Sequence, residues 1–231
     1  MALKCGIIGI TNTGKTTIFN CFSNRKAQST NFAFSTSKSN IGIIEVPDER
    51  LEKIDNIVNS AKVTPTTVEI LDIPGLAKGA SKGEGIGNKF LADIDRTDAL
   101  IHVVRCFDDE NLPHIEGSVN PVRDKEIIDL ELQVKDLESI DKRILRVEKV
   151  AKSGDKDAKK ELDVLNTYKK HLESFKPAIS APVDEADKKY VSDLFLLTIK
   201  PVMYVCNVDE ESAITGNKYV DDFKEFVKDE D

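Results

Sequence analysis

The sequence predicts an α/β protein whose mainly parallel sheet is flanked by helices and interrupted by an inserted helical hairpin. Three observations predict this fold. Short apolar runs alternate with segments of helical spacing, and a glycine-rich phosphate-binding motif joins the first run to the first helix. A long stretch of charged and aliphatic residues then breaks the alternation before the last apolar run.

The expected strands are short runs rich in valine and isoleucine. They occupy residues 3–8, 41–46, 68–73, 99–106 and 202–208. Helical patterns lie between most of these runs, at residues 16–22, 48–58 and 88–97. Because a helix after each strand returns the chain to the same end of a sheet, we expect parallel strands, with phosphate bound at the carboxyl end of the first one.

The segment between the fourth and fifth expected strands is far longer than one crossover helix requires. Residues 124–152 carry apolar side chains spaced by three or four, which predicts one long helix. Residues 153–155 break the pattern, and a second apolar stripe over residues 162–175 predicts the returning arm of an antiparallel hairpin. A third helical pattern, at residues 185–197, leads back to the sheet.

The hairpin surface allows two interpretations. Its apolar stripes are explained by core packing between the two arms. Basic residues gather near the tip but alternate with acidic ones, which favours a solvated charged face. A nucleic-acid contact at the tip is the alternative that remains open.

Residues 9–16 match the pattern G-x-x-x-x-G-K-[ST] between the first expected strand and helix. In such a loop, glycines let backbone N–H groups surround an anion. Lys15 supplies a charge for the outer phosphates and serves as a catalytic candidate, while the Thr16 hydroxyl can bind Mg²⁺. A glycine-rich turn is the alternative. The remaining nucleotide contacts expected in this loop are Asn12, Thr13, Gly14 and Thr17.

A second motif, D-x-x-G, follows the third expected strand. In this motif Asp72 holds the Mg²⁺ shell and the amide of Gly75 senses a γ-phosphate. The next residue is Leu76, where Ras-type switch proteins have a glutamine that orients the attacking water. Catalysis therefore needs another group or is slow. The glycine-rich run at residues 79–87 is a candidate switch loop, with a disordered linker as the alternative.

His114 is the candidate that replaces the missing glutamine. It follows the fourth expected strand, where a neutral imidazole can approach the γ-phosphate and orient water. His102 falls inside a strand and His171 falls on the hairpin. A histidine of a surface loop with no catalytic role is the alternative for His114.

The motifs together resemble those of the YchF, or Obg-like ATPase, family. The resemblance runs through the whole chain and rests on residues 9–16, 31–36, 72–88, 102–107 and 207–210. It implies a cytoplasmic, Mg²⁺-dependent P-loop ATPase that associates with the ribosome or a ribosomal subunit. It also implies that Thr36 closes on Mg²⁺ and the γ-phosphate, and that Asn12 helps to hold K⁺ against the phosphates. A purely loop-shaping role for Asn12 is the alternative.

The resemblance also implies a domain organisation. Residues 1–122 and 195–231 form a nucleotide-binding G-type domain that is incomplete at its C-terminus, and residues 123–194 form the coiled-coil-like hairpin insertion. The family continues into a further strand and helix and then a TGS domain, which this chain lacks, so a truncated chain is expected.

The choice of base depends on residues 207–210. GTP-binding proteins read guanine with N-K-x-D, whereas this chain has Val208 in place of Lys and Glu210 in place of Asp. The longer carboxylate disturbs the pairing with guanine, and Asn207 can still contact adenine. We therefore expect ATP to bind in preference to GTP. An Obg-type GTPase, or a nucleotide-controlled binding module with little turnover, remains the alternative.

The composition agrees with these expectations. The chain of 231 residues is 40% hydrophobic and 32% charged, with a formal net charge of −8. The acidic balance argues against sequence-specific DNA binding by the whole surface. Four scattered cysteines lack the spacing of metal ligands and are expected to be buried, reduced thiols. No charged segment precedes an apolar run at the N-terminus, so no secretory signal is expected. No apolar run approaches the length that spans a bilayer, so no membrane segment is expected either.

Overall fold

The computed structural model describes residues 2–22, 40–75 and 86–230. Its five strands form one sheet in the order β2-β3-β1-β4-β5. Their bounds are β1 (Leu3–Ile8), β2 (Asn40–Glu45), β3 (Thr67–Asp72), β4 (Ala99–Arg105) and β5 (Val202–Asn207). Strand β2 is antiparallel to β3, and the other three pairs are parallel. The predicted α/β fold with a mainly parallel sheet is confirmed.

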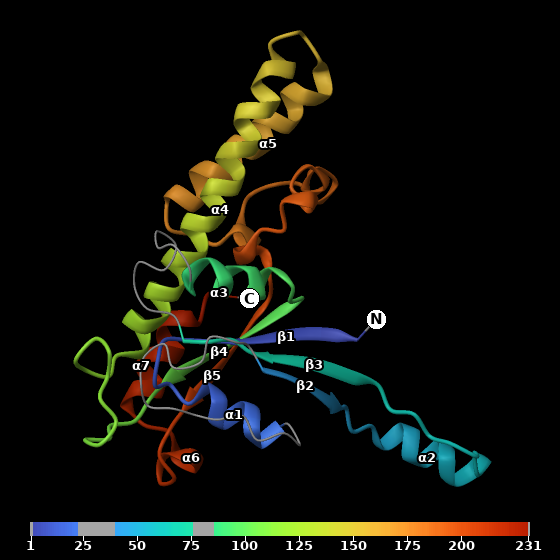
Figure 1. Cartoon of the computed structure of the whole chain (residues 1–231), viewed down its shortest axis with the longest axis vertical. Helices are drawn as coiled ribbons and strands as arrows, with labels where there is room; N and C mark the ends of the chain where they lie inside the picture. Colours follow the sequence, from blue (N-terminus) through green and yellow to red (C-terminus); the bar gives the residue numbers. More distant parts are fainter. Residues whose placement is uncertain (1, 23–39, 76–85, 231) are drawn as a thin grey trace.

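Helices cover both faces of the sheet (Figure 1). Helix α1 (Lys15–Phe22) lies on one face, where Phe19 packs against Ile7 and Val103. Helix α3 (Ile86–Asp95) lies on the other, where Phe90 and Ile94 join a cluster of strand side chains. Successive strand residues alternate between the two clusters, as expected of strands buried on both faces.

The described residues form three further helices outside the hairpin. Helix α7 (Lys218–Val227), preceded by the short α6 (Ser212–Thr215), packs Val220 and Phe223 against Val104 of β4. Helix α2 (Glu49–Val58) connects β2 to β3 along the chain and extends away from the sheet (Figure 1). The Asp48 side chain caps α2 by accepting from the backbone N–H of Arg50 at 2.9 Å.

The inserted hairpin is confirmed. It consists of α4 (Pro121–Ala151) and α5 (Lys156–Glu173), whose facing side chains share a core that includes Ile140, Leu165 and Tyr168. The hairpin projects from the rest of the molecule (Figure 1). Helix α4 begins three residues before the predicted position because Asn120 caps it and Pro121 fits its first turn. Both residues follow a polar loop without regularly spaced apolar residues, so the apolar spacing did not mark this start of the helix.

The first turns of α4 pack on the sheet. Ile128 and Leu132 belong to the same cluster as Phe90 of α3, whereas the buried apolar residues from Ile140 onward belong to the hairpin cluster. One helix therefore joins the sheet to the hairpin. The division at residues 122 and 123 remains a prediction.

The predicted third helix at residues 185–197 is wrong. The segment forms separate 3₁₀ turns, η3 (Glu185–Tyr190), η4 (Ser192–Leu194) and η5 (Leu197–Ile199), after an earlier turn, η2 (Ala178–Ser180). Phe195, with φ of 47°, separates η4 from η5. Apolar residues three apart suit 3₁₀ turns as well as an α-helix, and here they pack separately on the hairpin.

The cysteines follow the prediction only in part. Cys5 and Cys106 are buried, but Cys21 is exposed on the last turn of α1 and Cys206 is half-buried. The prediction that all four are buried is therefore wrong, because the pattern of α1 did not show which face meets the sheet. Across the described ranges, no helix is both long and apolar enough to cross a membrane.

Candidate nucleotide-binding site

The glycine-rich loop leaves β1 at the carboxyl edge of the sheet, between the ends of β3 and β4. Space requires a glycine at position 9, where the neighbouring atom is backbone, and at position 14 a larger residue would displace the Asn207 side chain. A Cβ on Gly9 would lie 2.4 Å from the Val103 carbonyl oxygen, and a Cβ on Gly14 would lie 2.3 Å from Nδ2 of Asn207. Both residues also have positive φ, at 147° and 93°. The loop thus has the close backbone approach that a phosphate cradle needs.

Lys15 lies inside this loop, with 7% of its surface exposed. Its ammonium group donates to the carbonyl oxygen of Ile10 at 2.5 Å. Burial lowers the pKa of Lys15 to about 8, and the nearby carboxylate of Asp72 only partly opposes this effect. A buried ammonium group whose hydrogen-bond partner is neutral gains more interaction energy from a bound anion than a solvated lysine would.

Thr16 and Asp72 meet at the start of α1. The Thr16 hydroxyl donates to Oδ2 of Asp72 at 2.9 Å, and Nδ2 of Asn40 approaches the same oxygen at 3.5 Å. Burial raises the pKa of Asp72, opposed by the Thr16 hydrogen bond and the Lys15 charge. A hydroxyl and a carboxylate oxygen side by side are the hard ligands that Mg²⁺ takes together with phosphate oxygens and water. These residues therefore fit the ion that the motif implies.

Gly75 lies against the loop. A Cβ at this position would come within 2.9 Å of the Cα of Thr11, so no larger residue fits without a shift. This contact brings the backbone after β3 beside the loop that follows β1. The D-x-x-G segment and the phosphate-binding loop are therefore adjacent, as the sequence predicted.

Asn12 connects the loop to the segment after β4. It has a φ of 63°, and its amide nitrogen donates to the carbonyl oxygen of Pro113 at 3.1 Å. Thr13 bonds within the loop, from its hydroxyl to the Ile10 carbonyl at 3.2 Å. Asn12 thus ties the loop to the segment after β4, and its role in holding K⁺ stays a prediction.

Asn207 reaches the same loop from β5. Its Nδ2 donates to the Thr13 carbonyl oxygen at 3.0 Å, which leaves its amide oxygen for other contacts. Glu210 is exposed in the following turn, where Asp209 accepts from the backbone N–H of Ser212 at 2.8 Å. The structure therefore places Asn207 beside the cradle and Glu210 at its periphery, with the base contacts of both residues untested.

The side chain of His114 is buried, although the residue as a whole is partly exposed, which argues against the surface-loop alternative. Its Nε2 lies 2.9 Å from Oδ2 of Asp124, and only 4% and 2% of the two side chains are exposed. Its Nδ1 accepts from the backbone N–H of Glu116 at 3.1 Å. The imidazole is therefore held in the loop next to Pro113, and its catalytic role stays a prediction.

The other site predictions divide into two groups. Thr17 is exposed on the first turn of α1, next to the cradle. Thr36, Leu76 and most of the candidate switch loop at residues 79–87 lie outside the described residues. Sequence reasoning missed Asn40, which faces Asp72 across the β2 and β3 pair, because no local motif marks it.

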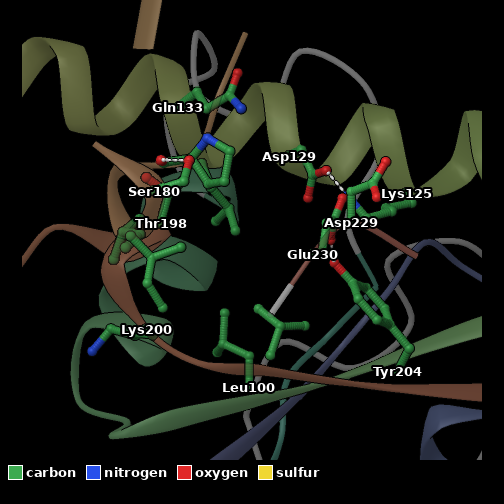
Figure 2. Close-up of a pocket in the computed structure, with 15 residues that line it drawn as sticks. Leu100, Lys125, Asp129, Gln133, Ser180, Thr198, Lys200, Tyr204, Asp229 and Glu230 are labelled. Carbon is green, nitrogen blue, oxygen red and sulfur yellow. Dashed lines mark hydrogen bonds and ion pairs between the residues drawn. The ribbon is translucent and has the colours of Figure 1, made fainter. Parts of the chain in front are cut away.

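A cavity of about 200 Å³ lies elsewhere, between α4 and the first residues of β4 and β5 (Figure 2). Its charged end contains Lys125, which pairs with Asp129 at 2.5 Å and with Glu230 at 2.8 Å. The Tyr204 hydroxyl donates to Glu230 at 2.6 Å. Because these strand residues precede the carboxyl edge, this cavity is separate from the phosphate-binding loop.

The fold and the cradle define a P-loop nucleotide-binding protein. A family profile described as "50S ribosome-binding GTPase" matches residues 4–208. The chain belongs to this family, in its YchF branch, which confirms the resemblance drawn from the sequence. It is similar to the "Ribosome-binding ATPase YchF" of Bacillus subtilis, with 48% identity over 98% of this chain and 63% of that protein.

Two further relatives agree with this assignment. The protein of the same name from Escherichia coli O157:H7 is 44% identical over 98% of this chain and 62% of its own length. The "Structure of the Schizosaccharomyces pombe YchF GTPase" superposes with a TM-score of 0.80 at 32% identity, covering 98% of this chain and 62% of that one. This chain thus spans a little under two thirds of the length of these relatives.

Proposed function

We propose that this chain is the nucleotide-binding part of a ribosome-associated, Mg²⁺-dependent ATPase that uses ATP hydrolysis as a conformational switch. The observation that carries the proposal is the convergence of Lys15, Thr16 and Asp72 at one end of the sheet. The printed names of the Bacillus and Escherichia relatives support both the ATPase activity and the ribosomal partner. A cytoplasmic location follows from such a partner.

Each residue of the cradle has a distinct role in this proposal. Lys15 leaves the carbonyl of Ile10 and pairs with the β- and γ-phosphates. Thr16 and Asp72 would hold Mg²⁺, which would supply positive charge against the negative charge that develops on the phosphates. Thr36 is proposed to complete this shell. Gly75 presents its backbone amide to the γ-phosphate.

Leu76 cannot orient an attacking water, so another group has to do so. We assign this role to His114, whose neighbour Pro113 already contacts the phosphate-binding loop through Asn12. The amide oxygen of Asn12 is left to help hold a K⁺ ion, which would stabilise negative charge on the phosphates. Both roles are tested by variants that keep nucleotide binding and change the rate.

ATP is proposed as the nucleotide because Val208 and Glu210 replace the lysine and aspartate that read guanine. A GTPase is the second candidate, since the matching family and the Schizosaccharomyces relative are both described as GTPases. The third is a nucleotide-controlled binding module with little turnover, which Leu76 favours.

Single-turnover release of phosphate tests the proposal. The purified chain in excess over ATP, with Mg²⁺ and K⁺, is expected to convert bound ATP to ADP and phosphate in one exponential phase. Removing Mg²⁺ with a chelator should abolish the phase, and replacing K⁺ with a larger organic cation should slow it. Tight ATP binding without phosphate release would favour the binding module.

A further inference from the structure

A network of hydrogen bonds surrounds His114 and joins three parts of the chain. The ring nitrogen Nδ1 accepts from the backbone N–H of Glu116, so Nε2 carries the proton and donates to Asp124. Asp124 belongs to the first turn of α4. Both ring nitrogens are therefore engaged, and neither is free to orient a water molecule in this arrangement.

Asp124 has a second partner. Its Oδ1 accepts from Nε of Arg123 at 3.1 Å and from Nη2 at 2.9 Å. Arg123 is 28% exposed and also donates to the Ser118 carbonyl at 2.5 Å, whereas its contact with Nδ1 of His114 is long, at 3.5 Å. Most of its bonds therefore remain when the imidazole moves. If the imidazole moves away, the carboxylate keeps an ionic partner, and the large penalty of an orphaned buried charge is avoided.

The backbone of the loop is fixed while the ring has room to move. The guanidinium of buried Arg105 donates to the carbonyls of Phe107 and Leu112 at 3.0 and 2.8 Å, and Asn12 holds the Pro113 carbonyl. A cavity of about 240 Å³ adjoins Pro113 and His114. The His114 side chain thus has open space beside it, while the loop backbone is held by these bonds.

From this arrangement we infer that Asp124 and Arg123 form a latch that holds His114 in an inactive position, and that displacement of the first turn of α4 releases it. This inference rests on the proposed catalytic role of His114. Asp124 is a positioning residue that acts through the imidazole. Since α4 is also the first arm of the hairpin, a partner that moves the hairpin changes the rate of hydrolysis through this contact.

The latch predicts opposite effects for its two residues. Asp124→Ala removes the acceptor of His114 and is expected to raise the single-turnover rate at saturating Mg²⁺-ATP about tenfold, because a hydrogen bond to a charged group is lost. Affinity for ATP should stay within about twofold of the wild type. Arg123→Gln removes the ionic partner of Asp124, so the carboxylate of Asp124 depends more strongly on its hydrogen bond with His114. This variant should therefore slow ATP hydrolysis.

Two further variants make the test specific. In the His114→Ala background, Asp124→Ala should cause no further change in rate. Asp141→Asn removes a carboxylate from the same helix that pairs with Lys169 of the hairpin, at 2.6 Å, and should leave the rate unchanged. Asp124→Asn, which keeps the shape of the side chain, should give a smaller acceleration and serves if the alanine variant does not fold.

Each outcome bears on one claim. Normal ATP binding with an unchanged or slower rate in both Asp124 variants would overturn the latch and leave the proposed ATPase standing. An accelerated rate that persists in the double variant would overturn the role of His114 as the released group, and the latch with it. A wild-type chain that binds no ATP would contradict the proposed function itself.

Discussion

The burial of Lys15 has a consequence for stability that is opposite to its role in binding. Burial lowers the pKa of Lys15 from 10.5 to about 8, and one pKa unit corresponds to 1.36 kcal/mol. Keeping Lys15 protonated in the folded chain at neutral pH therefore disfavours folding by roughly 3 kcal/mol. Lys15→Met, which removes the buried charge and keeps the volume, should therefore stabilise the chain without nucleotide by about 1–3 kcal/mol at pH 7.

The pH dependence of this gain has a definite sign. Because the folded pKa lies below the unfolded one, the penalty is fully present below about pH 8 and disappears as the pH rises toward 10.5. The difference in free energy of unfolding between Lys15→Met and wild type, measured by urea denaturation, should thus shrink from pH 7 to pH 10. Comparing two variants cancels the titration of other groups.

A matched control and a binding measurement complete this test. Lys4, with its side chain 45% exposed on β1, offers a lysine outside the loop, and Lys4→Met should change stability by less than about 0.5 kcal/mol. Lys15→Met should also lose Mg²⁺-ATP binding. A Lys15→Met variant that is less stable than wild type at pH 7, or that binds ATP normally, would refute the reasoning.

Three other variants test separate parts of the account. Thr16→Ala should make nucleotide binding independent of Mg²⁺, since one oxygen of the Thr16 and Asp72 pair is lost. Nucleotide titration with and without a chelator measures this, and an unchanged effect of Mg²⁺ on affinity would contradict it. Gly14→Ala should weaken ATP at least tenfold, because its Cβ would collide with Asn207; normal affinity would show that the loop adapts. Asp136→Ala should lower the free energy of unfolding, measured by urea denaturation, by about 2–4 kcal/mol, since three buried donors of residues 197 and 198 lose their acceptor. A loss below about 1 kcal/mol would mean that water replaces the missing carboxylate as acceptor.

Local signals allowed most of the fold to be predicted from the sequence. Each strand is an apolar run between turn residues, and the observed bounds of β1 match the prediction while the others differ by one residue at each shifted end. The phosphate-binding loop was equally accessible because its residues are consecutive. The hairpin followed from apolar spacing over a long segment.

Contacts between distant residues could not be predicted in this way. Asn207 and Thr13 are 194 positions apart, and nothing in either segment shows that an amide of one holds the backbone of the other. The sequence also placed His114 in a loop without showing that Asp124 holds it, because that contact depends on where α4 begins. The third helix failed for a related reason, since packing on the hairpin overrides local helical spacing.

The cradle around Lys15 is expected to bind Mg²⁺-ATP in preference to GTP, and a competition titration checks this claim. Both nucleotides compete with one fluorescent analogue on the same purified chain in Mg²⁺ buffer, so the ratio of the two affinities does not depend on the absolute values. We expect ATP to bind at least as tightly as GTP. GTP binding more than about tenfold tighter, a difference of about 1.4 kcal/mol, would contradict the claim and favour the GTPase.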